Sequence, residues 1–302
     1  MFIAGGTNLV DLMKRGITTP QKLVDINNLP LKEVRKEGAK LTVGALALNG
    51  AVADNELVRK EQPLLSLALQ AGASAQLRNM ATIGGNMMQR TRCPYFYNPD
   101  MPCNKREPGT GCGALKGFNR MHAIFTDSEK CIAVQPSDMS VALVALDTTV
   151  LVTGPKGDRR IPFQNFHRLP GDMPQKDNTL ERGELILGVE IPDNNFEKNV
   201  HYLKIRDRES YAFALVSVAA AMDMQGSTIR DVRLAMGGVA HKPWRLPEAE
   251  AFLKGKTASE ALFREAAALA MRGAKGFGHN NFKLGLAPTT IVEALKTASQ
   301  NK

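Results

Sequence analysis

Three of the chain's four cysteines lie in a segment of about residues 86–130 where regular hydrophobic periodicity disappears, and the fourth, Cys131, follows directly. Proline, glycine and basic residues replace the periodic apolar residues there. Loops longer than about 12–15 residues without secondary structure of their own are uncommon unless they are functional or disordered. The chain therefore has to fold around a long structured loop, here called the cysteine segment (residues 86–131). We expect its cysteines to act as a group: Cys93, Cys103, Cys112 and Cys131.

Three chemical roles compete for these cysteines. Two disulfides suit an oxidising compartment, but a chain long enough to bury a full core has little need of them. A zinc site made of four cysteines usually uses closely spaced C-x₂₋₄-C pairs, whereas the gaps here are nine, eight and eighteen residues. An iron–sulfur cluster tolerates wide spacing, because the cube is larger than a single ion. The spacing ranks a cluster first, zinc second and disulfides third.

Two glycine turns are candidate anion sites. Gly5-Gly6-Thr7-Asn8 follows the end of an expected strand and precedes a short helix, where backbone N–H groups favour an anion and glycine allows it to approach. Ala81-Thr82-Ile83-Gly84-Gly85-Asn86 offers a second turn. A tight turn with positive φ is the commoner explanation of a single Gly-Gly pair. Two such turns together suit a pyrophosphate, but neither matches the G-x-G-x-x-G fingerprint or a lysine-bearing phosphate loop.

The composition, with 43% apolar and 23% charged residues, is that of a folded protein. A chain of 302 residues usually divides into two domains. The polar, turn-rich residues 172–183 are the best linker candidate, so we expect domains at 1–175 and 183–300. In the first, strands are expected at 40–46 and 148–153 and helices at 63–72 and 137–147. In the second, strands at 184–191, 200–206, 213–224 and 228–239 precede helices at 247–253, 259–273 and 289–299, which predicts an α+β unit.

The net charge of +9 is a weak indication of an acidic partner, because Lys and Arg are spread along the chain without a block of five or six. One Trp, four Tyr and twelve Phe leave few aromatic rings for base stacking. No apolar run approaches the ~18–20 residues of a membrane helix, and the start of the chain lacks the features of a signal peptide. We expect no nucleic acid partner, no membrane span and no targeting sequence. An expected strand at residue 2 has no earlier partner, so we also expect a segment upstream of it.

Several motifs resemble the FAD-binding subunits of the xanthine oxidase family of molybdenum hydroxylases, and most closely the periplasmic aldehyde oxidoreductase type. They are the two glycine turns, the cysteine segment, and the runs at residues 76–86, 136–139, 204–214 and 237–245. The resemblance implies an α+β protein with a vanillyl-alcohol-oxidase-type FAD-binding domain. A C-terminal α+β domain of the CO dehydrogenase flavoprotein type would follow. Family members that have such a cysteine segment carry a [4Fe–4S] cluster beside the flavin.

The resemblance also assigns residues to the two cofactors. Cys93, Cys103, Cys112 and Cys131 would bind the [4Fe–4S] cluster. FAD would be bound by the two turns and three residues further along the chain: Ile3, Ala4, Gly5, Gly6, Thr7, Asn8, Leu9, Ala81, Thr82, Gly85, Asn86, Gln89, Asp138, Leu185 and Lys204. Lys204 would lie close to the isoalloxazine ring. Without the resemblance, Asp138 is typical of an acidic residue in the first turn of a helix, and Lys204 of a surface lysine.

The function implied is electron transfer by an oxidoreductase subunit, and no Ser/His/Asp or Cys/His arrangement indicates a catalytic site in this chain. The resemblance implies a heterotrimer in which a large molybdenum-cofactor subunit oxidises the aldehyde. A small subunit would pass electrons through [2Fe–2S] centres to FAD, and FAD would pass them to an external acceptor. It implies a periplasmic location reached by export with a partner, with the cytoplasm as the alternative. Two other functions stay open: a zinc-stabilised basic nucleic-acid-binding module and a stand-alone flavin oxidoreductase.

Overall fold

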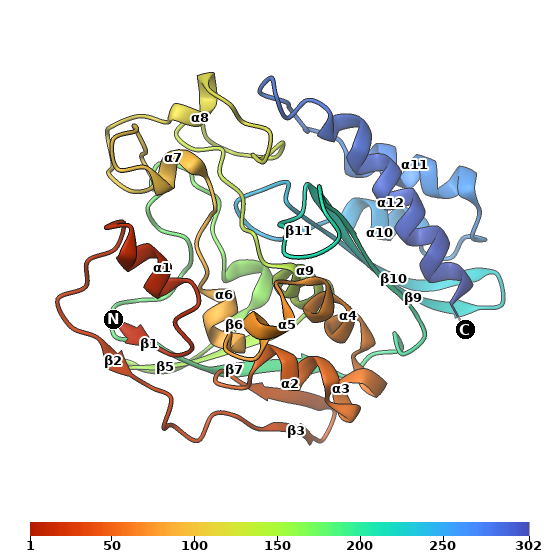
Figure 1. Cartoon of the computed structure of the whole chain (residues 1–302). Helices are drawn as coiled ribbons and strands as arrows, with labels where there is room; N and C mark the ends of the chain where they lie inside the picture. Colours follow the sequence, from red (N-terminus) through yellow and green to blue (C-terminus); the bar gives the residue numbers. More distant parts are fainter. Residues whose placement is uncertain (302) are drawn as a thin grey trace.

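Two antiparallel sheets with helices packed on them organise the structure, a computed structural model that describes residues 1–301 (Figure 1). The first sheet has five strands in the order β3-β4-β7-β5-β6. In β5, Val150 and Val152 are buried while Leu151 between them is half-buried, because successive side chains of a strand point to opposite faces. The strands of this sheet are β3 (Val34–Glu37), β4 (Lys40–Gly44), β5 (Thr149–Gly154), β6 (Gly157–Pro162) and β7 (Leu185–Pro192).

Short helices cover the buried face of the first sheet. Pro63 begins α4, a position that suits proline because the first N–H of a helix has no partner within the helix. Every residue of α9 is buried, because this helix lies between the two sheets and contacts α4, β9 and β10. Ser137 caps it by accepting a hydrogen bond from Ser140 N at 3.0 Å. These helices are α2 (Asn49–Asp54), α3 (Glu56–Glu61), α4 (Pro63–Ala71) and α9 (Asp138–Ala145).

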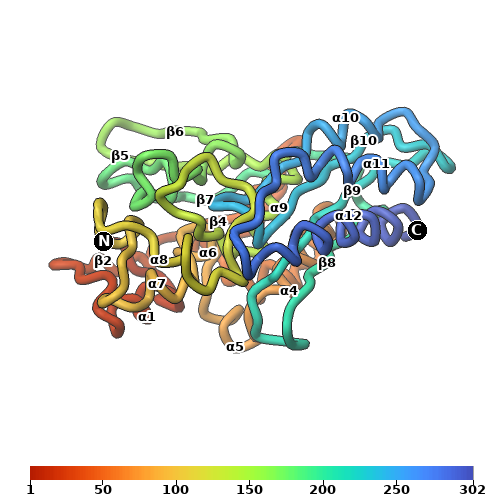
Figure 2. The backbone as a smooth tube through the Cα atoms, turned by 90° about the horizontal axis from the view of Figure 1, so that it is seen from above, coloured from red at the N-terminus to blue at the C-terminus, as the bar shows by residue number. Residues whose placement is uncertain are grey.

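The second sheet has the order β11-β10-β9-β8, and three helices cover the face that points away from α9. Residues 216–222 of β9 are all buried, and the alanines among them leave room for helices on both faces. In Figures 1 and 2 these helices lie toward the C-terminus, with α1 and the cysteine segment at the other end. The elements are β8 (Asn199–Ile205), β9 (Val216–Gln225), β10 (Thr228–Gly237), β11 (Trp244–Arg245), α10 (Pro247–Leu253), α11 (Glu260–Ala270) and α12 (Lys283–Gln300).

The structure moves the expected domain boundary. The strand expected to open the second domain is β7, which lies in the middle of the first sheet between β4 and β5. The first unit therefore continues to Pro192, and the second sheet begins with β8. Residues 172–183 were expected to be the linker between the domains. Instead, this segment contacts the cysteine segment, where Asp177 forms ion pairs with Lys105 and Arg90.

Several small elements complete the first unit. The expected strand at residue 2 is β1, which pairs in parallel with β2. The cysteine segment, expected as a loop, contains two single-turn helices, α7 and α8. The elements are β1 (Phe2–Ile3), α1 (Leu9–Lys14), β2 (Val24–Asp25), α5 (Ala75–Arg78), α6 (Ile83–Met87), α7 (Pro94–Tyr97), α8 (Gly113–Lys116) and a 3₁₀ turn (Phe163–Asn165).

The expected α+β class is confirmed, and so are most of the expected elements. The exception at the C-terminus is α12, which begins at Lys283 rather than at 289 and contains Pro288. Its first turn is buried at Lys283, whose amine donates to the backbone oxygens of His122 and Gly238, so tertiary contacts extend the helix past the proline. No helix in residues 1–301 is both long enough and apolar enough to span a membrane.

A buried histidine makes stability depend on pH. His167 is buried, its Nε2 lies 2.9 Å from Met87 O, and burial lowers its pKa to about 4. As the pH falls below 6.5, His167 binds a proton in the unfolded chain, whereas in the folded chain it stays neutral down to about pH 4. The free energy of unfolding therefore falls as the pH is lowered from 6.5 to 4. His167 contributes about 3 kcal/mol at most to this loss. In urea unfolding, His167→Gln, whose amide can still donate to Met87 O, should give a shallower pH dependence; an unchanged dependence would contradict this.

Candidate functional site

The two glycine turns lie against each other. A Cβ atom at Gly5 would be 1.8 Å from the backbone oxygen of Met80, directly before the second turn. Gly6 has a φ of +70°, a left-handed conformation that other residues rarely adopt. Only glycine fits at these two positions. The fold therefore brings together two turns that are far apart in the sequence.

The two turns differ in the hydrogen-bond donors that they leave free. The backbone N–H groups of residues 5–9 have no protein acceptor within residues 1–301. Successive free N–H groups of this kind make a concave site for an anion. In the second turn, Gly84 N donates to Ala45 O at 2.8 Å and Gly85 N to Thr82 Oγ1 at 3.1 Å. We expected donors from both turns, but the second turn uses these N–H groups to fix α6 beside β4.

The second turn instead contributes side chains that are linked to α9. Asn86 Oδ1 accepts hydrogen bonds from Ser137 Oγ at 2.7 Å and from Gln89 Nε2 at 2.5 Å. Ser137 is the residue that caps α9. The predicted FAD residues Asn86 and Gln89 thus form one network with the start of the helix that carries Asp138.

The remaining predicted FAD residues near the turns flank them directly. They end β1, surround the start of α1 or precede α6: Ile3, Ala4, Thr7, Leu9 and Ala81. Leu185 lies elsewhere, at the beginning of β7, where it pairs with Thr153. Within residues 1–301, no hydrogen bond connects Leu185 with either turn.

Asn8 joins the first turn to the cysteine segment. Its Oδ1 accepts a hydrogen bond from Arg90 N at 2.9 Å, and its Nδ2 donates to Tyr97 Oη at 3.4 Å. Leu12 of α1 packs in one apolar cluster with Phe96 and Cys103. The first turn and the cysteine segment are therefore neighbours.

Asp138 and Lys204 form a buried ion pair between α9 and β8. Lys204 Nζ lies 2.7 Å from Asp138 Oδ2 and also donates to Ala71 O at 3.0 Å. Tyr202 Oη donates to Asp138 Oδ1 at 2.8 Å. Burial raises the pKa of Asp138, and the charge of Lys204 opposes that rise. The Lys204 side chain is only 4% exposed, so it is not the surface lysine that its residue type alone would suggest.

The four cysteines are free thiols, and each lies near at least one of the others. Cys103 and Cys112 face each other across an isolated antiparallel bridge. A hydrogen bond from the Cys131 thiol lowers the pKa of Cys112 to about 6, against the effect of burial. Burial raises the pKa of Cys93 to about 12, and the nearby Cys103 and Cys112 add to that rise. In residues 1–301, no group of three or more His, Cys, Asp and Glu side chains is arranged to hold a single metal ion.

Backbone hydrogen bonds affect the pKa values of two of these thiols. Those from Phe96 and Tyr95 oppose the rise in the pKa of Cys93. Those from Ala114, Ile132 and Leu115 add to the lowering of the pKa of Cys112. Hydrogen bonds to cysteine sulfur are a feature of iron–sulfur sites, where they tune the cluster. A set of four thiols with N–H donors around them therefore fits such a cluster.

Buried cations hold the cysteine segment in place. Lys105 is 4% exposed, donates to Pro174 O at 2.8 Å and pairs with Asp177, which also pairs with Arg90 Nε at 2.7 Å. Burial alone would raise the pKa of Asp177, but the charges of Lys105 and Arg90 hold it below its ordinary value. Arg106 donates to backbone oxygens of residues 95–101 and so closes the loop that carries α7.

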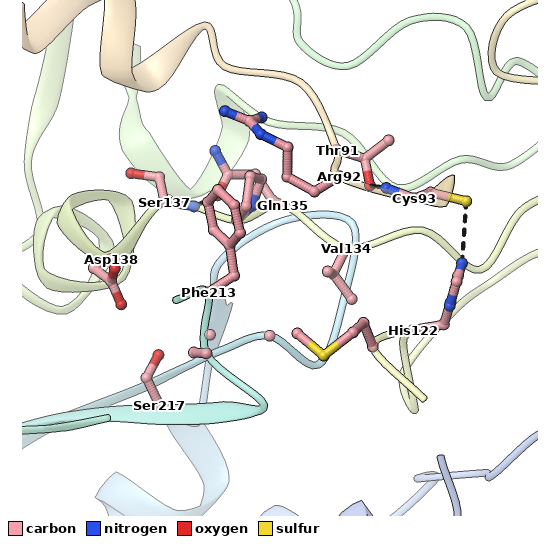
Figure 3. A pocket seen from close by; sticks show the side chains of 15 residues that line it. Thr91, Arg92, Cys93, His122, Val134, Gln135, Ser137, Asp138, Phe213 and Ser217 are labelled. Carbon is pink, nitrogen blue, oxygen red and sulfur yellow. Dashed lines mark hydrogen bonds between the residues drawn. The ribbon is translucent and has the colours of Figure 1, made fainter. Parts of the chain in front are cut away.

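A cavity of about 150 Å³ lies between the cysteine segment, the start of α9 and the second sheet (Figure 3). Cys93 and His122 line one end, and Asp138 and Ser217 line the other. The cavity therefore connects the cysteine group with the buried ion pair.

The sequence did not single out the side chains that complete this cavity. His122 Nε2 lies 3.1 Å from Cys93 Sγ, and burial, with a smaller effect of Lys283, lowers the pKa of His122 to about 4. The Arg92 guanidinium lies 4.9 Å from the centre of the Phe213 ring. The only signal for His122 was its position in the cysteine segment, because the five histidines share no ligand spacing.

Both units match known families. Residues 1–194 match the family described as the FAD binding domain in molybdopterin dehydrogenase. Residues 201–298 match the CO dehydrogenase flavoprotein C-terminal domain. The gap between the two matches, residues 195–200, overlaps the connection between the end of β7 at Pro192 and the start of β8 at Asn199.

The chain is similar to subunits of known enzymes. It is 48% identical to the aldehyde oxidoreductase FAD-binding subunit PaoB of Escherichia coli (strain K12), over 98% of this chain and 91% of that protein. It is 27% identical to the glyceraldehyde dehydrogenase medium chain of Sulfolobus acidocaldarius, over 88% and 77%. Among solved structures, carbon monoxide dehydrogenase from Hydrogenophaga pseudoflava has the same fold, with a TM-score of 0.76 and 24% identity over 99% of this chain and 88% of that chain.

The Asp177 cluster should stabilise the protein in a pH-dependent way. Asp177→Asn leaves Lys105 buried without a full counter-charge and should lower the free energy of unfolding by about 3 kcal/mol at neutral pH. Because the pKa of Asp177 is lowered, its stabilisation is present above pH 3.8 and is lost as the pH falls below that value.

Urea unfolding at pH 7 and pH 3 measures both effects. Asp172→Asn is the control, because its ion pair with Lys130 is exposed and should contribute nothing measurable. Equal stability of the Asp177 variant and the control at pH 7 would contradict the prediction.

Proposed function

The chain belongs to the FAD-binding subunits of the xanthine oxidase family of molybdenum hydroxylases, and we propose that it is the electron-transfer subunit of an aldehyde oxidoreductase. The observation that carries this proposal is the contact between the first glycine turn and the cysteine segment. That contact puts a candidate FAD site and a candidate iron–sulfur site side by side in one chain. FAD accepts and releases electrons, and an iron–sulfur cluster transfers them singly, so the two sites together suit electron transfer.

The first turn is the proposed site of the FAD pyrophosphate. Its free N–H groups supply hydrogen-bond donors, and Gly5 and Gly6 leave no side chain to obstruct the approach of the anion. Asn86, Gln89 and Thr82 would line the second side of the cofactor, with Asn86 held in position by Ser137. Leu185 is also proposed to bind FAD, but no contact to either glycine turn supports this role.

Asp138 and Lys204 would act on the flavin end as a neutral pair. Each is buried and each neutralises the other, so the pair can offer hydrogen bonds without a net charge. Asp138 and Ser217 line the cavity that reaches Cys93, which supports placing the ring system near this pair.

The four cysteines are the proposed ligands of a [4Fe–4S] cluster: Cys93, Cys103, Cys112 and Cys131. Their grouping, their backbone N–H donors and the absence of a disulfide among the described residues support this assignment. When bound, such a cluster would exchange single electrons. The chain's own contribution is to bury Cys103 and Cys131, to keep Cys93 and Cys112 half-buried, and to donate hydrogen bonds to the cysteines.

The similarity to PaoB supports aldehydes as the substrate class. Oxidation of an aldehyde with water gives a carboxylic acid, two electrons and two protons, and we place that reaction on a large molybdenum-cofactor subunit. A small [2Fe–2S] subunit would deliver the electrons, and an external acceptor would remove them. The medium-chain names of several relatives support a partner on either side. We further propose a periplasmic location, reached by export with a partner.

Gly5→Ala should empty the FAD site. The added methyl group would meet the backbone oxygen of Met80, which cannot move like a side chain, so the two turns must separate. We expect the purified variant to lose most of its FAD. The matched control is Gly285→Ala in α12, where nothing lies within 4 Å of the new Cβ atom and where alanine should stabilise the helix. Equal FAD content in the two variants would contradict the site.

Reduction by substrate tests the proposed function. In a complex co-expressed with both partner subunits, an aldehyde should bleach the yellow absorbance of the flavin. The complex should contain more iron and acid-labile sulfide than the [2Fe–2S] centres of the small subunit account for. The chain alone should not oxidise the aldehyde. Turnover by the chain alone would instead indicate a stand-alone flavin oxidoreductase, and zinc bound to this chain, with no iron beyond that of the [2Fe–2S] centres, would indicate the zinc-stabilised module.

A further inference from the structure

We propose that His122 is a positioning residue for the iron–sulfur site, donating its Nε2–H to the sulfur of Cys93 and holding that ligand at the wall of the cavity. This inference rests on the proposed function, because it concerns the cluster that Cys93 would bind. It goes further by assigning a side chain that tunes one ligand of the four. Within residues 1–301, His122 is the histidine whose ring contacts a cysteine sulfur.

The contact is direct and shielded from water. His122 Nε2 lies 3.1 Å from Cys93 Sγ, the distance of a hydrogen bond to sulfur (Figure 3). The histidine is only 3% exposed, whereas Cys93 is half-buried, so the contact is shielded from water on the side of the ring. Cys93 also accepts from backbone N–H groups of α7, and the histidine approaches from a different part of the segment.

The main chain around His122 is fixed by the second unit. Its carbonyl oxygen accepts from Lys283 Nζ at 3.0 Å and from Asn280 Nδ2 at 3.4 Å. Its N–H donates to Asn119 O at 3.0 Å. Lys283 and Asn280 are both fully buried at the start of α12, so the ring is presented to Cys93 from a rigid support.

A bound cluster would favour the His122 tautomer that carries its proton on Nε2. A thiolate that binds iron carries no proton, so a hydrogen bond to it needs a donor. His122 Nδ1 has no partner among the described residues. A proton on Nε2 therefore makes the one hydrogen bond that the ring has available.

Such a bond should raise the reduction potential of the cluster. An N–H donor withdraws charge from the sulfur and stabilises the more negative, reduced state. Loss of the donor should shift the potential downward. Cys93 is the cysteine that lines the cavity together with His122 and Asp138, so the tuned ligand would be the one that borders the proposed flavin site.

Two substitutions separate the hydrogen bond from the space that the ring fills. His122→Phe keeps a planar ring and removes the donor, whereas His122→Gln places an amide N–H near the position of Nε2. His201→Phe on β8 is the control, a half-buried histidine with no contact to the cysteines. Each variant is purified as the complex with both partners, its iron content is measured, and the cluster is titrated potentiometrically with detection by electron paramagnetic resonance.

The proposal predicts a lower cluster potential in His122→Phe, with His122→Gln and His201→Phe close to the unsubstituted protein. Loss of the cluster in His122→Phe but not in His122→Gln supports it equally. The proposal is overturned if both His122 variants keep the original potential, if both shift to the same extent, or if His122→Gln loses the cluster while His201→Phe keeps it. A complex of the unsubstituted chain without its own cluster would refute the proposed function instead.

Discussion

The buried ion pair between Asp138 and Lys204 is the interaction on which the arrangement of the molecule depends. It joins the first residue of α9 to β8, and Lys204 also holds the end of α4 through Ala71 O. Removing one member of a buried pair leaves the other charge without compensation, at a cost of about 3–5 kcal/mol. The pair therefore fixes the two sheets relative to each other. It also sets the position of Ser137 and, through it, of Asn86 in the second glycine turn.

The cysteine segment takes its shape from the rest of the chain rather than from its own secondary structure. Lys105 and Arg90 anchor it to Asp177, Asn8 anchors it to the first turn, and α12 anchors it at His122. These hydrogen bonds and ion pairs come from sequence positions far apart, and each joins a polar group to a polar partner. A long loop held in this way can place four thiols accurately, which a metal cluster requires.

Regular elements were predictable wherever hydrophobic periodicity was strong. β8, β10, α10 and α11 follow apolar patterns that one sheet or one helix face explains. The sequence pattern predicts β7 as a strand of the second unit, but it lies in the first sheet, because a sequence pattern does not state which strands become neighbours. The start of α12 was missed because Pro288 suggests a boundary, whereas buried contacts of Lys283 decide it.

The candidate site shows the same division between local and long-range information. The glycine turns and the cysteines could be found by residue type, because two Gly-Gly turns of similar composition and four cysteines in one segment are visible in the sequence itself. The pairing of Lys204 with Asp138 and the contact of His122 with Cys93 depend on tertiary structure and could not be found in that way.

Mössbauer spectroscopy of the ⁵⁷Fe-enriched complex, with FAD quantified in the same sample, tests whether the four thiols bind a cluster beside the flavin. We expect a four-iron component in a ratio of one cluster per FAD, besides the signals of the partner's [2Fe–2S] centres; signals of those centres alone would contradict it.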